Sequence, residues 1–478
     1  MKSSVTDRHE RGPHLSGRRV RGLSWSVGNT RAPRSMTALG SARHPGRTPW
    51  TRHVLFGLIC LIAFTSIDTF NTRLTGLTDD QMVQQGSDIR SQVAAVGLWV
   101  VLLLVSFIPG MSLSRPVAKG LVWPALLLVW IVVSPLWSDD PAHGVSKAAA
   151  FLVTSLAAWR MASVVMVKEM LSCTFYTLLV LLALSVFLAV AVPDVGLLQH
   201  DWQHEGQWKG VFATKQGLGT VSAVFLVFAF LRLSYRRSAF NVATCALGLV
   251  CLLGSGSRGG GVIAAVAVAS LVVVRRSPRF AALVAGILLT GLVLGVLEVA
   301  YFSATGNSSI QVFGFDIDLT ERTFIWQYAI GHWGGRPYLG FGLNGFWTNA
   351  DILSLYRTAH GWVLDNYHSG YMAITVETGL VGLALFSAMS FSLASRLRFL
   401  LLHARSNRMS LEMTAGYVIM FFTINLTETD FLRSTNFMAV LFTFLVIKTL
   451  AIPEPSRALA RAGTRYPAGV RITTWTAR

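Results

Sequence analysis

Long runs of apolar residues alternate with short polar segments along most of this chain of 478 residues. The runs are roughly 15–25 residues long, the length that an α-helix needs to cross about 30 Å of hydrocarbon. The pattern therefore predicts an all-α integral membrane protein with about twelve transmembrane helices. We expect these helices near 53–68, 92–109, 119–133, 147–167, 171–192, 216–231, 239–254, 260–274, 280–301, 369–395, 411–426 and 436–451.

The same pattern divides the chain into five parts. A basic tail at 1–52 precedes nine helices at 53–301, and a long polar segment at 302–367 separates these from three further helices at 368–451. A second basic tail occupies 452–478. Loops as long as 302–367 are usually functional, and this one has room for a small structured unit outside the membrane.

Basic residues occur in every second loop between the predicted helices. Since cytoplasmic loops of membrane proteins are enriched in Lys and Arg, these loops and both termini are expected to face the cytoplasm. The segment at 302–367 then lies on the extracytoplasmic side. The inner loops hold Arg115, Lys119, Arg160, Lys168, Arg232, Arg236, Arg237, Arg275, Arg276, Arg279, Arg396, Arg398, Arg405 and Arg408.

Composition agrees with a membrane protein and argues against a nucleic-acid partner. Hydrophobic residues make up 53% of the chain and charged residues 13%, and the net charge is +18. About half of that excess lies in residues 1–52, a Gly-, Ser- and Arg-rich segment without an apolar pattern, which is typical of a disordered cytoplasmic tail. The four cysteines lie inside apolar runs and show no spacing of a metal site.

Two stretches of the long segment carry local signals. ERTFIWQYAIGHW (321–333) places Phe324, Tyr328 and Trp333 at the spacing of an amphipathic helix. GGRPYLGFGLNGF (334–346) has the glycines and proline of a tight turn that returns the chain toward the membrane.

Several polar residues are predicted to gather at the extracytoplasmic face. Lys209 and Lys215 precede the sixth helix, Arg258 occupies a Gly-rich turn, His368 begins the tenth helix, and Glu428 ends the eleventh. Charge beside hydrocarbon is costly, so such residues are functional candidates.

Each of these residues also has a simpler interpretation. His368 could be an interfacial histidine beside a helix cap made by Ser369, and Arg258 could bind a lipid phosphate. The two lysines could anchor a helix at the interface, and Glu377 could be a buried hydrogen-bond partner on the helical turns after His368.

Taken together, however, the cations and the histidine indicate one chemistry. Cations and free backbone N–H groups stabilise the charge of a pyrophosphate, and an imidazole can remove a proton from a sugar hydroxyl near neutral pH. This combination favours glycosyl transfer from a lipid diphosphate.

The chain also resembles a family, the superfamily of O-antigen ligases and exopolysaccharide polymerases in bacterial membranes. The resemblance follows the ordered stretches WSDDP, KGVFATKQGLG, SGSRGGG, ERTFIWQYAI, RPYLGFGLNGF, HSGYMAITVETGLVGLALF and NLTETDF, over about residues 130 to 435.

This resemblance implies a metal-independent glycosyltransferase without a cofactor that uses an undecaprenyl-diphosphate-linked glycan as its donor. It implies that Arg258 holds the diphosphate, that His368 activates the acceptor, and that Arg322 contacts donor or acceptor. Lys209 stands where the family has an arginine, and Thr214, Lys215 and Gln216 stand where it has His-Lys-Asn, so either lysine could contact the diphosphate.

We therefore expect a polymerase of lipid-linked repeat units in the bacterial plasma membrane, with Glu377 and Glu428 supporting an extracytoplasmic active site. The expected partners are the lipid-linked donor, a sugar acceptor, membrane lipids and other polysaccharide export proteins. Cations in at least three places favour two lipid carriers, as a polymerase needs: the Lys209/Lys215 segment, Arg258, and the loop arginines Arg322, Arg336 and Arg357. The alternatives are a ligase that moves a finished glycan, a lipid-linked glycan flippase or transporter, and a non-catalytic assembly partner.

Overall fold

The computed structural model describes residues 49–67, 89–107, 118–199, 205–277, 309–312, 315–318, 320–360, 366–403 and 407–452. The helix expected at 280–301 lies outside these residues, as do the basic tails except for the first turn of the first helix. The side chains of Arg322 and Arg357 also lie outside the described part.

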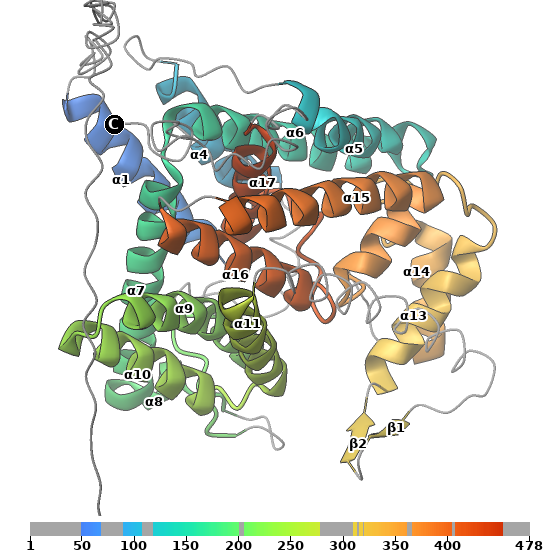
Figure 1. Ribbon diagram of the computed structural model, residues 1–478. Coiled ribbons are helices and arrows are strands. Elements are labelled where there is room, and N and C mark those ends of the chain that lie inside the picture. Colours follow the sequence, from blue (N-terminus) through green and yellow to red (C-terminus); the bar gives the residue numbers. More distant parts are fainter. Residues whose placement is uncertain are drawn as a thin grey trace, which may run out of the picture. The chain divides into compact units, whose positions relative to one another are not determined.

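Helices make up most of the described residues (Figure 1). Each of the other eleven expected helices overlaps one of them, so the predicted helical fold class is confirmed. The helices are α1 (Pro49–Ser66), α4 (Ile89–Val105), η1 (Ala118–Leu121), α5 (Val122–Val133), η2 (Ser134–Trp137), α6 (Pro141–Val164), α7 (Val167–Ala191), α8 (Pro193–Gly196), α9 (Lys215–Tyr235), α10 (Ala239–Gly254), α11 (Arg258–Arg276), α13 (Thr320–Trp333), α14 (Ala350–His360), α15 (Gly370–His403), α16 (Arg408–Ile424) and α17 (Phe437–Leu450).

Four of the described helices, α7, α9, α11 and α15, are long and apolar enough to cross a membrane. Other apolar helices are shorter. With 16 residues, for example, α10 reaches only about 24 Å at 1.5 Å per residue. The structure therefore supports several spans, and the number of twelve remains a prediction.

The long polar segment contains more structure than its sequence suggested. Strands β1 (Ser309–Val312) and β2 (Phe315–Asp318) form an antiparallel pair, which the all-α expectation did not include. Helix α13 agrees with the predicted helix at 321–333. Helix α14 was not predicted, although Asn349 before it is a good N-cap and its side-chain oxygen accepts the N–H of Ile352 at 3.0 Å.

Two hydrophobic clusters hold the described helices together. The larger one joins the membrane helices through stacked rings, such as Phe175 with Phe225 and Phe421 with Phe442. The smaller one lies under α13 and α14 and is rich in aromatic residues. Its fully buried members include Ile325, Phe346, Tyr356 and Tyr367.

The helices α11 and α16 run in opposite directions, which fixes which helix ends lie together. Glu412, near the start of α16, forms ion pairs with Arg275 at the end of α11 (2.9 Å) and with Arg408 (2.8 Å). The last turn of α16 therefore lies at the same end as Arg258, the first residue of α11. We call this the His368 end, because α16 ends beside the segment that carries His368, and we call the opposite one the Glu412 end.

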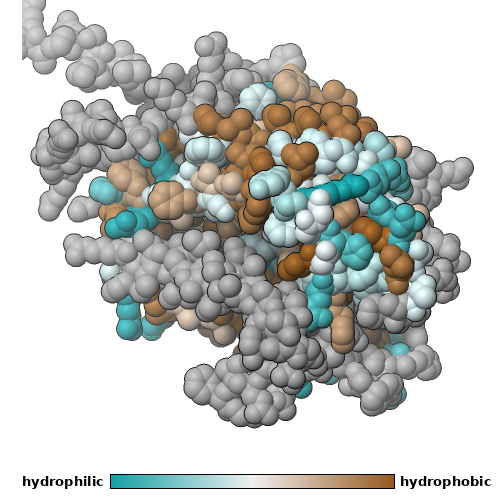
Figure 2. Space-filling model, turned by 90° about the vertical axis from the view of Figure 1, so that its right-hand side faces the viewer, coloured by the Kyte–Doolittle hydropathy of each residue, from teal (hydrophilic) through white to brown (hydrophobic). Residues whose placement is uncertain are grey.

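Large hydrophobic side chains remain exposed on several helices, as a membrane protein requires. On α5 they include Val122, Leu126 and Val129, which follow one helix face. Figure 2 shows one side of the molecule, where hydrophobic residues gather along the upper part and hydrophilic residues lie beside them.

Candidate functional site

Lys215 begins α9, and its side chain is buried at the His368 end. Its Nζ donates a hydrogen bond to Oε1 of Gln207 at 2.8 Å. Thr214 caps the helix, since its hydroxyl oxygen accepts the N–H of Gly217 at 3.0 Å. Lys209, on the loop before α9, is buried to the same degree, with 8% of its surface exposed. Both lysines are therefore buried, Lys209 on the loop and Lys215 at the first residue of α9.

Arg258 begins α11 and is exposed. Ser257 caps this helix by accepting the N–H of Gly260 at 3.1 Å. The turn before Arg258 packs on the loop that carries Lys209, because the backbone N–H of Trp208 donates to the carbonyl oxygen of Gly254 at 2.9 Å. Arg258 is thus held next to the loop that carries Lys209 and leads into α9 at Lys215.

Glycines let the first turns of α9 and α11 approach each other closely. A Cβ on Gly260 would lie 2.8 Å from the backbone carbonyl carbon of Gly219, and a Cβ on Gly219 would lie 2.3 Å from Cβ of Ser257. The N-termini of α9 and α11 therefore lie side by side, with Lys215 and Arg258 as their first residues. Such an arrangement stabilises anions. We call Lys209, Lys215 and Arg258 the cation cluster.

His368 lies directly before α15 in an uncommon backbone conformation. Its φ is 49°, in the left-handed region that non-glycine residues seldom adopt. Its N–H donates to Oδ1 of Asn366 at 2.8 Å, and its side chain is half-buried. Ser369 caps α15 as expected, because its hydroxyl oxygen accepts the N–H of Met372 at 3.4 Å.

The turn after α16 holds this segment in place. The N–H of Gly370 donates to the carbonyl oxygens of Asn425 (2.9 Å) and Glu428 (2.8 Å). The N–H of Ser369 donates to the hydroxyl of Thr429 at 3.2 Å. The carbonyl oxygen of Glu428, one of the predicted supporting residues, thus helps to position the start of α15.

Glu377 supports the same segment from within α15. It is buried, and its Oε2 accepts the N–H of Asn344 at 2.9 Å. It also lies beside Tyr367, the residue before His368, where burial and the Glu377 carboxylate raise the pKa of the tyrosine well above its usual value. The predicted interpretation of Glu377 as a buried hydrogen-bond partner agrees with these contacts.

Asp139, which follows η2, holds the segment between α13 and α14 in place. This carboxylate accepts hydrogen bonds from Arg336 and from the side-chain amide of Asn349, each at 2.7 Å. The hydrogen bond from Arg336 holds the pKa of Asp139 below its usual value, although burial acts to raise it, and the hydrogen bond from Asn349 lowers it further. Arg336 was predicted as one of several surplus cations, and here it serves as a structural ion pair.

Several residues at this end were not predicted from the sequence. Gln207, Asn425 and Asn344 are ordinary polar residues in loops, and only their positions beside Lys215, Gly370 and Glu377 reveal what they do. The NLTETD stretch was noticed for its carboxylates. Yet the side-chain oxygen of Asn425 organises it by accepting the N–H groups of Asp430 and Phe431, each at 2.9 Å.

The structure places His368, the cation cluster, Glu377 and Glu428 at one end of the described helices. Comparison with known families now adds to this geometry. Residues 243–387 match the family described as O-antigen ligase, a range that includes Arg258, Arg322, His368 and Glu377. A comparison with curated proteins gave no match. The chain therefore contains a region at residues 243–387 that is similar to the O-antigen ligase family, and four of its described helices are long and apolar enough to cross a membrane.

Proposed function

We propose that this protein is a glycosyltransferase that polymerises oligosaccharide repeat units carried on undecaprenyl diphosphate. The observation that carries the proposal is the position of His368 and the cation cluster at the same end of antiparallel helices. The imidazole of His368 can accept a proton there, while the side chains of the cation cluster stabilise a diphosphate. Glycosyl transfer from a lipid diphosphate needs both.

The reaction is a displacement at the anomeric carbon of the donor sugar. His368 removes the proton of the acceptor hydroxyl as its oxygen forms a bond to that carbon. The bond between the anomeric carbon and the diphosphate oxygen breaks, and the lipid diphosphate leaves as an anion. The cation cluster stabilises this departing charge. A direct displacement of this kind inverts the anomeric centre, which the family resemblance also leads us to expect.

Lys215 is the stronger candidate of the two lysines for contact with the diphosphate. It begins a helix next to the N-terminus of α11, whereas the backbone N–H of Lys209 points back to the carbonyl oxygen of Gly196 at 2.9 Å. The side chains of these residues and of Arg258 supply positive charge, so we propose turnover without a divalent metal or other cofactor. Arg322 lies in the first turn of α13, the helix whose Trp326 contacts the His368 segment, and it remains a candidate for donor or acceptor binding.

We further propose that the His368 end faces the extracytoplasmic side of the bacterial plasma membrane and that both termini are cytoplasmic. The Glu412 end carries Arg232, Arg236, Arg275, Arg276 and Arg408, which agrees with the excess of basic residues in cytoplasmic loops. The donor and the growing chain would then meet where the glycan is exported.

A single incubation tests the polymerase. Purified protein in lipid nanodiscs receives lipid-diphosphate-linked repeat units and no other acceptor, and the products are separated by size. A ladder of repeat lengths supports polymerisation. Transfer that occurs only after a second lipid or protein acceptor is added would show a ligase instead, and recovery of the units unchanged under both conditions would refute both.

A further inference from the structure

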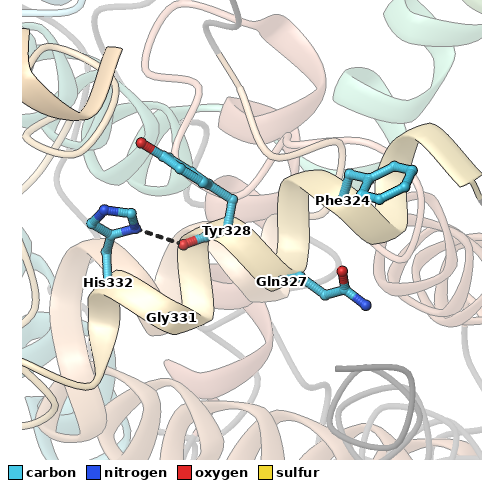
Figure 3. A pocket seen from close by; sticks show the side chains of 5 residues that line it. All are labelled: Phe324, Gln327, Tyr328, Gly331 and His332. Atoms are coloured by element: carbon cyan, nitrogen blue, oxygen red, sulfur yellow. Dashed lines mark hydrogen bonds between the residues drawn. The ribbon is translucent and has the colours of Figure 1, made fainter. Parts of the chain in front are cut away.

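One face of α13 carries an open pocket that the proposed reaction does not use. Its lining comes from Phe324, Gln327, Tyr328, Gly331 and His332, and its volume is about 350 Å³ (Figure 3). Since these positions recur every three or four residues, they form one continuous stripe along the helix. The pocket falls at the lower end of the size range of small-molecule sites.

The opposite face of the helix fixes this stripe in place. Ile325 and Ala329 are buried in the aromatic cluster under α13. The hydroxyl of Tyr328 donates to the carbonyl oxygen of Ile352 on α14 at 2.7 Å. The pocket is therefore formed before any ligand arrives, so little conformational entropy is lost on binding.

Among the residues that line the pocket, Phe324 is the large hydrophobic residue with an exposed side chain. Phe324 has the spacing of an amphipathic helix together with Tyr328 and Trp333, yet 45% of its surface is exposed. A large aromatic ring that is partly exposed beside a pocket can serve as a binding surface. It is typical of a residue that a ligand covers.

The pocket mixes rings with polar groups, which identifies the kind of ligand. The imidazole of His332 lies 4.4 Å from the Tyr328 ring, centre to centre, and its Nδ1 lies 2.9 Å from the carbonyl oxygen of Tyr328. When Nδ1 donates to that oxygen, Nε2 is left as an acceptor. The Gln327 amide adds both donors and an acceptor. A lipid acyl chain cannot form hydrogen bonds with these groups. A sugar ring can pack its apolar C–H faces on the aromatic rings, and its hydroxyls can form hydrogen bonds with the amide and the imidazole.

The pocket is also joined to the proposed catalytic segment. Nε1 of Trp326, on the same helix, donates to the carbonyl oxygen of Tyr367 at 2.8 Å, directly before His368. A sugar bound on α13 is thus held by an element that contacts the segment carrying the base.

We infer that the α13 pocket is a saccharide-binding subsite that holds a sugar ring of the glycan chain away from the reacting bond. The ring stacks on Phe324 and Tyr328 and forms hydrogen bonds with Gln327 and His332. The inference rests on the proposed function in one respect, namely that the bound sugar belongs to the lipid-linked glycan of that reaction.

Direct binding separates the subsite from catalysis. The probe is the free oligosaccharide that mild acid releases from lipid-linked repeat units, which has no diphosphate for the cation cluster to recognise. Its affinity is measured on full-length protein in nanodiscs. Wild type and His368→Ala should bind it equally, whereas Phe324→Ala and Gln327→Ala should each weaken binding about tenfold or more.

A filled pocket gives a sharper test. A side chain added at Gly331 meets no atom within 4 Å, so Gly331→Leu extends into open space and should fold while it blocks the ligand. Phe391→Ala is the matched control, because this phenylalanine is 75% exposed on α15, outside the pocket. Loss of binding in Gly331→Leu with wild-type binding in Phe391→Ala is the expected result.

Two results would overturn the subsite. One is no binding of the oligosaccharide by wild type. The other is an affinity for the oligosaccharide that stays at the wild-type value in both Phe324→Ala and Gly331→Leu. The same conclusion holds if Phe324→Ala changes only how the protein contacts lipid. An active His368→Ala enzyme would instead refute the proposed mechanism and leave the subsite standing.

Discussion

The backbone N–H of Gly370 lies 2.9 Å from the carbonyl oxygen of Asn425, and this contact joins the start of α15 to the end of α16. A Cβ on Gly370 would lie 2.0 Å from Oδ1 of Asn425, which is itself buried. Gly370→Ala must therefore move the residues around His368.

We expect Gly370→Ala to lower glycan transfer at least tenfold while the protein still inserts into the membrane, because His368 is kept but displaced. Transfer rate and membrane-inserted protein are measured on the same samples. Gly57→Ala is the control, since a Cβ there meets nothing within 4 Å. If Gly370→Ala and Gly57→Ala have equal activity, the contact with Asn425 does not position the catalytic segment.

The cation cluster should affect the donor more than the acceptor. We expect Arg258→Ala to raise the donor KM or lower kcat about tenfold or more, and Arg258→Lys to restore activity only in part, since lysine lacks the two-pronged guanidinium. Lys215→Met should have a larger effect than Lys209→Met. Steady-state kinetics with varied donor would detect this order, and equal, wild-type values in all four variants would exclude a role in diphosphate binding.

The Asp139–Arg336 pair should stabilise the protein in a pH-dependent way. The folded-state pKa of Asp139 lies below its usual value near 3.8, so the carboxylate contributes stability above that pH and loses it as pH falls through the folded-state pKa. Asp139→Asn should therefore have a lower thermal midpoint than wild type at pH 6 to 7. The difference should shrink below about pH 4. The effect is modest, because both side chains are partly exposed. A gap that stays constant with pH would show that the ion pair is not its source.

The proposed orientation can be tested with single cysteines in a variant whose four native cysteines are replaced. Ser354 on α14 and Arg236 after α9 are both exposed and lie outside the hydrophobic clusters. In intact cells an impermeant thiol reagent should label Ser354→Cys and spare Arg236→Cys. The opposite pattern would reverse the topology.

The helices could be predicted from the sequence because each depends on local composition. A run of apolar residues of the right length is visible without any knowledge of neighbours, and α10 (Ala239–Gly254) has the predicted bounds. The unit before His368 was harder to predict. Its strands and α14 are short and depend on contacts with distant residues, such as the bond between Tyr328 and Ile352.

The candidate site shows the same division. His368 and Arg258 stand out in the sequence because charge at the end of an apolar run is unusual. Gln207 and Asn425 do not, since an amide in a loop is common and its role depends on which backbone folds against it. The exposure of Phe324 could not be predicted either, because three aromatic residues on a helix do not show which side the rest of the protein covers.

The most direct test of the mechanism compares His368→Ala with wild type in the transfer of lipid-linked repeat units at saturating donor. One imidazole at a helix start adds little to a bundle packed by many apolar side chains, so the variant should insert into the membrane and keep its affinity for the donor. A general base contributes roughly 10²–10⁴ in rate, so transfer should fall by about that factor. Donor binding that remains intact while the ladder of products disappears is the predicted result. A folded His368→Ala protein that forms product at the wild-type rate would contradict the role of His368 as the base.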